Sequence, residues 1–134
     1  MVYLDACTII YLIEGAPAFQ ASAAAFVSPY QSDPSTRLMT SRLSRMECRV
    51  KPLREGQTAL LAVYESFFSA RRMQVAEVSS AVIERATELR VRYQVRTPDA
   101  LHLATAIESG AVAFLTGDAA LKRCTELNVQ VIAP

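Results

Sequence analysis

The stretch VYLDACTIIYLIEG, residues 2–15, decides the fold of this chain. Its first three residues are apolar and precede an aspartate, which is the pattern of a short buried strand followed by a turn. The apolar run over 8–13 then ends at Gly15, and glycine is common just after the last turn of a helix. Asp5 is therefore predicted between a strand and a helix. In open α/β sheets, ligands bind at this place, beyond the carboxyl ends of parallel strands.

Length and composition predict one ordinary globular domain. The 134 residues suffice for a single hydrophobic core, so 1–134 is interpreted as a single domain. No apolar run approaches the roughly 20 residues that cross a bilayer, and no secretory signal pattern precedes the first strand. The widely spaced Cys7, Cys48 and Cys124 predict buried free thiols and neither a disulfide framework nor a zinc site. We therefore expect a cytoplasmic protein with no membrane segment. The net charge of +1 gives no global electrostatic case for nucleic-acid binding.

Strand and helix patterns alternate along the whole chain. Segment 29–35, with two prolines and Asp33, is predicted as a loop. Strands are predicted at 2–4, 37–41, 73–78, 111–116 and 129–132, and helices at 8–13, 19–27, 41–55, 58–72, 80–93, 97–110 and 119–127. This alternation predicts an α/β fold with a mostly parallel sheet covered on both faces.

The helix predicted at 41–55 has an apolar face and a basic stripe. The apolar residues recur every three or four positions, which predicts packing on the core; they are Leu43, Met46, Val50 and Leu53. The stripe consists of Arg42, Arg45 and Arg49. It suits contact with a phosphate backbone, and equally a solvated face or salt bridges to a protein partner. In the next helix, Tyr64, Phe67 and Phe68 are expected to be mainly core residues.

Three of the four aspartates fall where strands end or helices begin. Asp5 and Asp118 each follow a predicted strand, and Asp99 lies in the first turn of a helix that Thr97 is predicted to cap. If these positions converge on one sheet edge, the like charges are most easily kept ionised by a divalent cation. Hard oxygen ligands without a His or Cys pattern point to Mg²⁺ or Mn²⁺. Such an ion polarises a phosphodiester and activates water.

Helix capping explains Asp5 and Asp99 equally well, and taken singly it is the favoured interpretation of Asp118. Aspartate is a preferred cap, and an acid is favoured near a helix N-terminus. Spacing does not decide between the two interpretations. The sequence does exclude three other kinds of acidic site. A haloacid-dehalogenase-type phosphatase needs a second aspartate two positions after Asp5, but Ala6 and Cys7 follow it. The patterns of metal-dependent adhesion sites and of response-regulator receivers are also missing.

Four segments together resemble the PIN-domain ribonucleases. Residues 3–15 resemble the first motif of that family, 96–106 (RTPDALHLATA) the helix of its third acid, and 115–121 (LTGDAAL) its last motif. Residues 41–47 (SRLSRME) are similar to the segment with its second acid. The resemblance covers essentially the whole chain in order, spacing and length, and is strongest to VapC-type toxins of toxin–antitoxin pairs. It implies a PIN-like three-layer α/β/α domain with a mostly parallel central sheet.

The resemblance also implies a site and an activity. Asp5, Glu47, Asp99 and Asp118 would bind one or two Mg²⁺ or Mn²⁺ ions, with Asp5 and Asp99 the expected direct ligands. Thr116, and Thr8 from the first helix, would orient a ligand or the attacking water. The implied reaction is hydrolysis of an RNA phosphodiester by metal-activated water. The implied partners are an RNA substrate, a small antitoxin that occludes the site, and a second copy in a homodimer.

Some residues depart from the family pattern or stay open. Gly117 stands where asparagine is frequent, and Cys7 replaces a usual asparagine or serine near Asp5. His102, one turn after Asp99, is interpreted as structural or as a support behind the acids. Glu14 opposes the dipole of the first helix, which suggests a place near the site or in the antitoxin contact. Two other functions remain: a PIN nuclease of RNA processing without an antitoxin, and a non-catalytic α/β binding module whose aspartates only cap helices.

Overall fold

The structure is a computed structural model that describes residues 1–134. One sheet has the strand order β3-β2-β1-β4-β5, and all four pairings are parallel. The strands are β1 (Val2–Leu4), β2 (Leu38–Ser41), β3 (Met73–Ala76), β4 (Ala113–Thr116) and β5 (Val129–Val131). β1 lies in the middle of the sheet and is buried on both faces, which explains why its three residues are all apolar. The predicted parallel sheet is confirmed.

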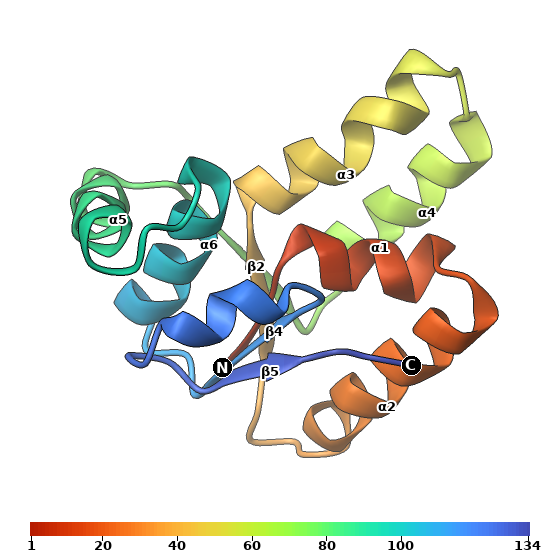
Figure 1. Cartoon of the computed structure of the whole chain (residues 1–134). Helices are drawn as coiled ribbons and strands as arrows, with labels where there is room; N and C mark the ends of the chain where they lie inside the picture. Colours follow the sequence, from red (N-terminus) through yellow and green to blue (C-terminus); the bar gives the residue numbers. More distant parts are fainter.

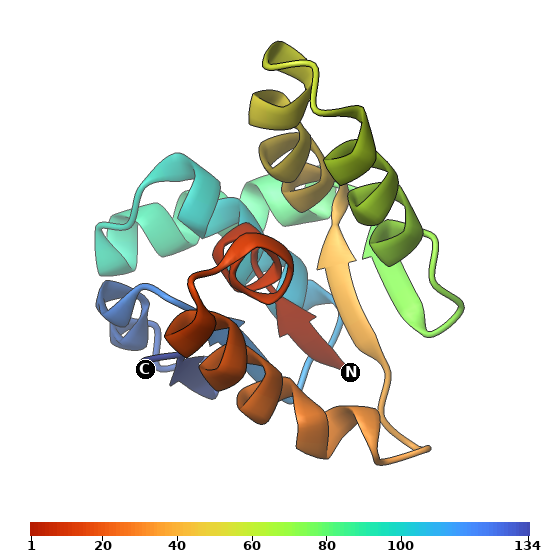
Figure 2. The ribbon, with the colours of Figure 1, turned by 90° about the vertical axis from the view of Figure 1, so that its right-hand side faces the viewer.

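Helices cover both faces of this sheet, so the predicted three-layer α/β/α architecture is confirmed (Figures 1 and 2). The helices are α1 (Ala6–Glu14), α2 (Pro17–Gln31), α3 (Arg42–Arg54), α4 (Thr58–Phe68), α5 (Ser80–Tyr93) and α6 (Thr97–Glu108), followed by the short 3-10 helix η1 (Ala119–Arg123). α1 to α4 pack on one face, and α5, α6 and η1 on the other. No helix combines the length and the apolar character that crossing a bilayer requires.

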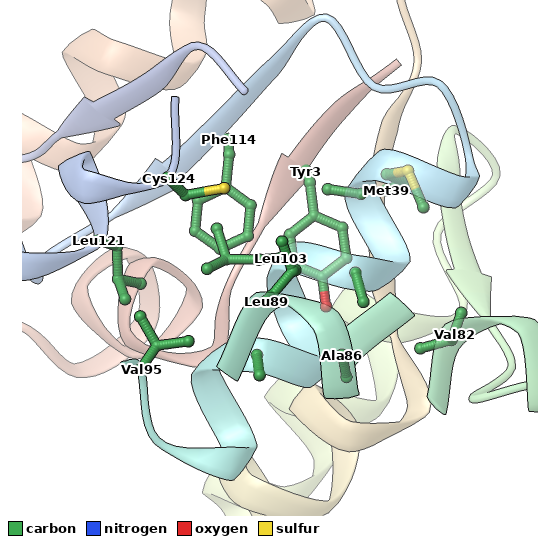
Figure 3. Packing of buried hydrophobic residues seen from close by; sticks show 13 residues of the cluster. Tyr3, Met39, Val82, Ala86, Leu89, Val95, Leu103, Phe114, Leu121 and Cys124 are labelled. Carbon is green, nitrogen blue, oxygen red and sulfur yellow. The ribbon is translucent and has the colours of Figure 1, made fainter. Parts of the chain in front are cut away.

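Each central strand contributes to two hydrophobic cores because successive side chains point to opposite faces. Tyr3, Met39 and Phe114 lie in the core under α5 and α6, which Figure 3 shows from close by. Val2 and Leu115 lie in the other core, with α1 to α4. The rings of Tyr3 and Phe114 are stacked, with centroids 5.2 Å apart and planes 2° from parallel. This packing fixes the ring of Tyr3 and, with it, the position of the Tyr3 hydroxyl.

α2 is longer than the predicted helix 19–27 and includes Pro29, so the prediction that residue 29 begins a loop is wrong. Proline lacks a backbone N–H, and within a helix its ring clashes with the carbonyl group of the residue four positions earlier. Pro29 stands in the last turns on an exposed side, and the Ser32 N–H donates to the Ser28 carbonyl to close the helix. The predicted turn at Asp33 is confirmed by a local network with Ser35.

Two further helices are shorter than predicted. α4 ends at Phe68 and not at residue 72, and the predicted helix 119–127 is reduced to η1. β5 runs parallel to β4 and pairs Val129 with Phe114, so the chain must return along the sheet within residues 117–128. The connection contains one 3-10 turn in place of the longer helix.

The prediction that α3 buries its apolar stripe is wrong. Met46, Val50 and Leu53 are 54%, 49% and 56% exposed. The buried side of α3 instead carries the small residues Ser44 and Cys48, together with Pro52. Small side chains let α3 approach α1 closely, as shown by the 3.9 Å between Cys48 Sγ and the Ala6 carbonyl oxygen. The apolar periodicity identified a hydrophobic face, but this chain does not cover it.

Candidate active site

The three central strands lead directly into the acidic residues. β2, β1 and β4 are neighbours in the sheet and run in the same direction. β1 ends before Asp5, β4 before Asp118, and β2 continues into α3, which carries Glu47. α6 brings Asp99 in its first turn. All four sequence-predicted acids therefore belong to elements that begin at or pack beside the carboxyl edge of the sheet.

Asp5 is buried between β1 and α1 and caps that helix. Its Oδ1 accepts a hydrogen bond of 2.9 Å from the Thr8 N–H. Burial raises the pKa of the Asp5 carboxyl, although hydrogen bonds from Thr116 and Thr8 work in the opposite direction. The capping interpretation is thus correct for Asp5. It leaves a carboxylate whose charged form the surroundings only partly compensate.

Two buried threonines join α1 to the end of β4. The Thr8 hydroxyl donates to the Leu115 carbonyl at 2.8 Å, so its hydrogen is used within the fold. The Thr116 hydroxyl accepts from the Asp118 N–H at 3.1 Å and also stabilises the Asp5 carboxylate. Thr116 therefore connects two of the acids, and Thr8 acts on Asp5 mainly through its backbone N–H.

Asp99 and Asp118 influence each other across the edge. Burial raises the pKa of Asp99; the nearby Arg96 lowers it, and the charge of Asp118 raises it further. Arg96 Nε lies 3.6 Å from Asp99 Oδ2, and the arginine side chain is 83% exposed. Asp118 caps η1 by accepting 2.9 Å from the Ala120 N–H. Asp99 caps nothing: the N-cap position of α6 is Arg96, so the predicted Thr97 cap is wrong.

Glu47 makes a contact that the sequence analysis did not predict. Its Oε1 lies 2.6 Å from His102 Nε2, and His102 Nδ1 lies 2.7 Å from the Tyr3 hydroxyl oxygen. His102 and Tyr3 are both buried. Two signals were present in the sequence: His102 stands one turn after Asp99 on the same helix, and Tyr3 shares a strand face with Asp5.

The comparisons with known proteins agree with this architecture. The PIN-domain family model matches residues 2–127. The chain belongs to the PIN-domain family. No curated protein matches it by sequence. Among solved structures, VapBC2 from Rickettsia felis, bound to a DNA fragment from its promoter, has a TM-score of 0.76 at 19% identity, over 99% of this chain and 100% of that chain.

Two further structures share the fold. A toxin–antitoxin complex from Klebsiella pneumoniae has a TM-score of 0.74 at 20% identity, over 98% of this chain and 97% of that chain. VapC20 from Mycobacterium tuberculosis, a toxin that cleaves the sarcin–ricin loop, has a TM-score of 0.68 at 19% identity, over 85% of this chain and 87% of that chain. At these identities the likeness is one of fold.

Cys7 and Gly117, the two residues that depart from the usual PIN pattern, lie next to each other. A Cβ on Gly117 would come within 2.7 Å of both Cys7 Sγ and the Tyr11 ring. Glycine is therefore required here unless both the Cys7 side chain and the Tyr11 ring move. All three cysteines are free thiols, as predicted; Cys48 and Cys124 are buried, whereas Cys7 is partly exposed.

The four acids of this PIN domain suit a hard divalent cation by chemistry. They offer only carboxylate oxygens, the ligands that Mg²⁺ and Mn²⁺ prefer. Burial raises the pKa of Asp5 and of Asp99, and a bound cation relieves that cost. No three acidic, histidine or cysteine side chains converge closely enough to hold an ion in this geometry. Each acid instead has a protein partner: Thr8 N–H for Asp5, His102 for Glu47, Arg96 for Asp99 and Ala120 N–H for Asp118.

Proposed function

We propose that this PIN-domain protein is a metal-dependent endoribonuclease that hydrolyses RNA phosphodiester bonds, and the toxin of a toxin–antitoxin pair. The main support for the proposal is that the ionised acids at the carboxyl edge of the sheet are in an unfavourable environment. Asp5 is buried, Asp99 is half-buried, and the charge of Asp118 opposes that of Asp99. Perturbed acids gathered in one place are typical of functional sites, and a bound cation would offset their charge.

In this proposal Mg²⁺ or Mn²⁺ would be held by Asp5 and Asp99, with Glu47 and Asp118 completing the site directly or through water. Such an ion, when bound, would polarise the phosphate and lower the pKa of the attacking water. The chain's own residues orient these parts. The Thr8 N–H holds one oxygen of Asp5, and Thr116 connects Asp5 to the backbone of Asp118. Arg96 is exposed beside Asp99 and is suited to contact an RNA phosphate.

A protein partner is supported by the uncovered apolar face of α3. Met46, Val50 and Leu53 are about half exposed, and exposed apolar patches commonly mark interaction sites. Two arginines of the predicted basic stripe already have partners in the chain: Arg45 pairs with Glu65 at 2.8 Å, and Arg42 with Glu77 at 3.8 Å. We propose an antitoxin as the partner and a homodimer as the state of the free protein. Light scattering of the purified protein, alone and with a co-expressed antitoxin, tests both.

Cleavage of a mixed RNA pool tests the nuclease. Purified protein is incubated with Mg²⁺ or Mn²⁺, and with EDTA, beside the variant Asp99→Asn. The matched control is Asp33→Asn, the same substitution at an exposed turn away from the acidic edge. We expect metal-dependent cleavage that Asp99→Asn abolishes and Asp33→Asn leaves unchanged. Equal cleavage by Asp99→Asn would contradict the assignment.

Calorimetric titration with Mn²⁺ separates the nuclease from a binding module whose aspartates are only caps. Asparagine caps a helix about as well as aspartate does. If capping is the whole role of Asp5, the wild type binds no Mn²⁺, and Asp5→Asn changes neither Mn²⁺ binding nor RNA cleavage. A nuclease of RNA processing would instead cleave RNA but have no antitoxin, and no gene for a small DNA-binding protein would lie beside its own.

A further inference from the structure

We propose that His102 positions the Glu47 carboxylate, and that Tyr3 in turn holds the His102 ring. The inference rests on the proposed function, because it concerns the second acid of the metal site. The contacts run through three elements: Tyr3 on β1, His102 on α6 and Glu47 on α3. They place 2.7 Å between Tyr3 Oη and His102 Nδ1, and 2.6 Å between His102 Nε2 and Glu47 Oε1.

The hydrogen-bonding groups fix the direction of the contact with Glu47. An ionised carboxylate only accepts hydrogen bonds, so Nε2 of His102 must supply the hydrogen. Hydrogen bonds to an ionised group are shorter and stronger than bonds between neutral groups, in keeping with the 2.6 Å separation. His102 therefore acts on Glu47 as a donor at a defined point in space.

The donor is rigid because its support lies in the core. The side chain of His102 is only 4% exposed. The Tyr3 ring stacks on Phe114 among the buried side chains drawn in Figure 3. At its polar end, Tyr3 Oη is also hydrogen-bonded to Ser41 Oγ at 2.9 Å. A tyrosine, and not a phenylalanine, at this buried position is explained by these polar contacts.

Glu47 needs such a support. Its side chain is 33% exposed, and His102 supplies its only hydrogen bond. A glutamate side chain has several rotatable bonds, and ordering it costs conformational entropy. Holding one oxygen on His102 restricts the Glu47 carboxylate to one place before any cation arrives.

Two substitutions at one position separate positioning from packing. In His102→Gln the amide nitrogen can reach the place of Nε2, whereas in His102→Asn it reaches only the place of Nδ1. We therefore expect Mn²⁺ affinity, measured by calorimetry, to fall about 10- to 100-fold in His102→Asn and to stay close to wild type in His102→Gln. Tyr3→Phe, which removes only the hydroxyl, should weaken Mn²⁺ binding in the same direction but less.

The matched control is Tyr64→Phe. Tyr64 is also fully buried, and its hydroxyl donates to the carboxylate of Glu14, which is not one of the four proposed metal ligands. Tyr64→Phe should leave Mn²⁺ affinity unchanged. If it weakens binding as much as Tyr3→Phe does, the effect is one of general stability and the proposal fails. Equal losses in His102→Asn and His102→Gln would overturn it as well.

A metal-free measurement keeps this inference apart from the proposed function. In ¹⁵N-labelled protein with EDTA, the His102 Nε2–H should give a slowly exchanging resonance that disappears in Glu47→Leu. If that resonance is absent from the wild type, the positioning contact does not exist, whatever the protein does with RNA. If it is present but the wild type neither binds Mn²⁺ nor cleaves RNA, the nuclease assignment fails while the contact stands.

Discussion

Two aspartates at opposite ends of the strands have opposite environments. Asp33, in the turn before β2, is exposed and accepts hydrogen bonds from Ser35 and Thr36, which hold its pKa below the usual value. Asp5, directly after β1, is buried, and burial raises its pKa. Both residues satisfy backbone donors, so hydrogen bonding alone does not separate them. Their burial and the direction of their pKa shifts do.

The opposite pKa shifts show which ionised acid the folded chain stabilises without a bound ligand. Asp33 is more stable ionised in the folded chain than outside it. Asp5 and Asp99 are less so, and the repulsion between Asp99 and Asp118 adds to the cost. Proteins accept local costs of this kind mainly at functional sites. The comparison therefore predicts that replacing the acids at the two ends has opposite effects on stability and activity.

The largest expected effect is on RNA cleavage. Asp5→Asn should reduce metal-dependent cleavage by more than about 100-fold, since losing a direct ligand costs at least as much as losing a supporting residue. Asp33→Asn should cleave at the wild-type rate. Single-turnover assays on one labelled RNA at saturating Mg²⁺ measure both. Equal losses at the two positions would remove the distinction between the two ends of the sheet.

The next effect is stabilisation by the cation. A ligand that binds only the folded state adds about 2.7 kcal/mol at 100 times its dissociation constant. Mn²⁺ should raise the unfolding temperature of the wild type and of Asp33→Asn, and should not raise that of Asp99→Asn. Because protons compete for the same carboxylates, the rise should be greater at pH 8 than at pH 5. Thermal melts at the two pH values give the answer; a rise in Asp99→Asn equal to wild type would contradict it.

In EDTA, where no cation is bound, we expect Asp5→Asn to stabilise the protein. A carboxyl with a raised folded pKa stabilises the protein fully below its unfolded pKa, near 3.8, and that contribution is lost as pH rises through the folded pKa. Asp5→Asn removes this loss while keeping a capping side chain. The metal-free variant should therefore be more stable than wild type at pH 7, and the difference should shrink toward pH 3. Urea unfolding across that range tests it. A variant less stable than wild type at pH 7 would mean that the Asp5 charge is compensated within the chain.

Much of this comparison was accessible from the sequence, because it depends on local patterns. Short apolar runs and the alternating stretch 73–78 predicted strands, and the residues after the apolar runs located Asp5 and Asp118 at strand ends. Asp33 between two prolines was correctly predicted in a turn. Local chemistry sufficed in each case, since a turn or a cap is formed by residues two or three positions apart.

Contacts between distant elements were not accessible. The apolar periodicity of α3 located a hydrophobic face, but no local signal tells that α1 approaches the opposite side through Cys48. In the same way, His102 could be placed near Asp99, whereas its contact with Glu47 requires the packing of α6 against α3. The extent of η1 depended on where β5 pairs with β4. These features follow from tertiary packing, which overrides local preference.

The smallest expected effect is the change in stability caused by Asp33→Ala. Asp33→Ala removes the acceptor for Ser35 and Thr36 from an exposed turn, so the protein should lose a little stability at pH 7, less than Asp5→Asn changes it in EDTA. The lowered folded pKa of Asp33 means that its contribution is present above the unfolded pKa, near 3.8, and is lost as pH falls through the folded value. Wild type and Asp33→Ala should therefore converge in acid, whereas wild type and Asp5→Asn diverge as pH rises. Urea unfolding of the three proteins in one pH series measures both trends, and parallel curves for the two variants would show that the two ends of the sheet hold their aspartates in the same way.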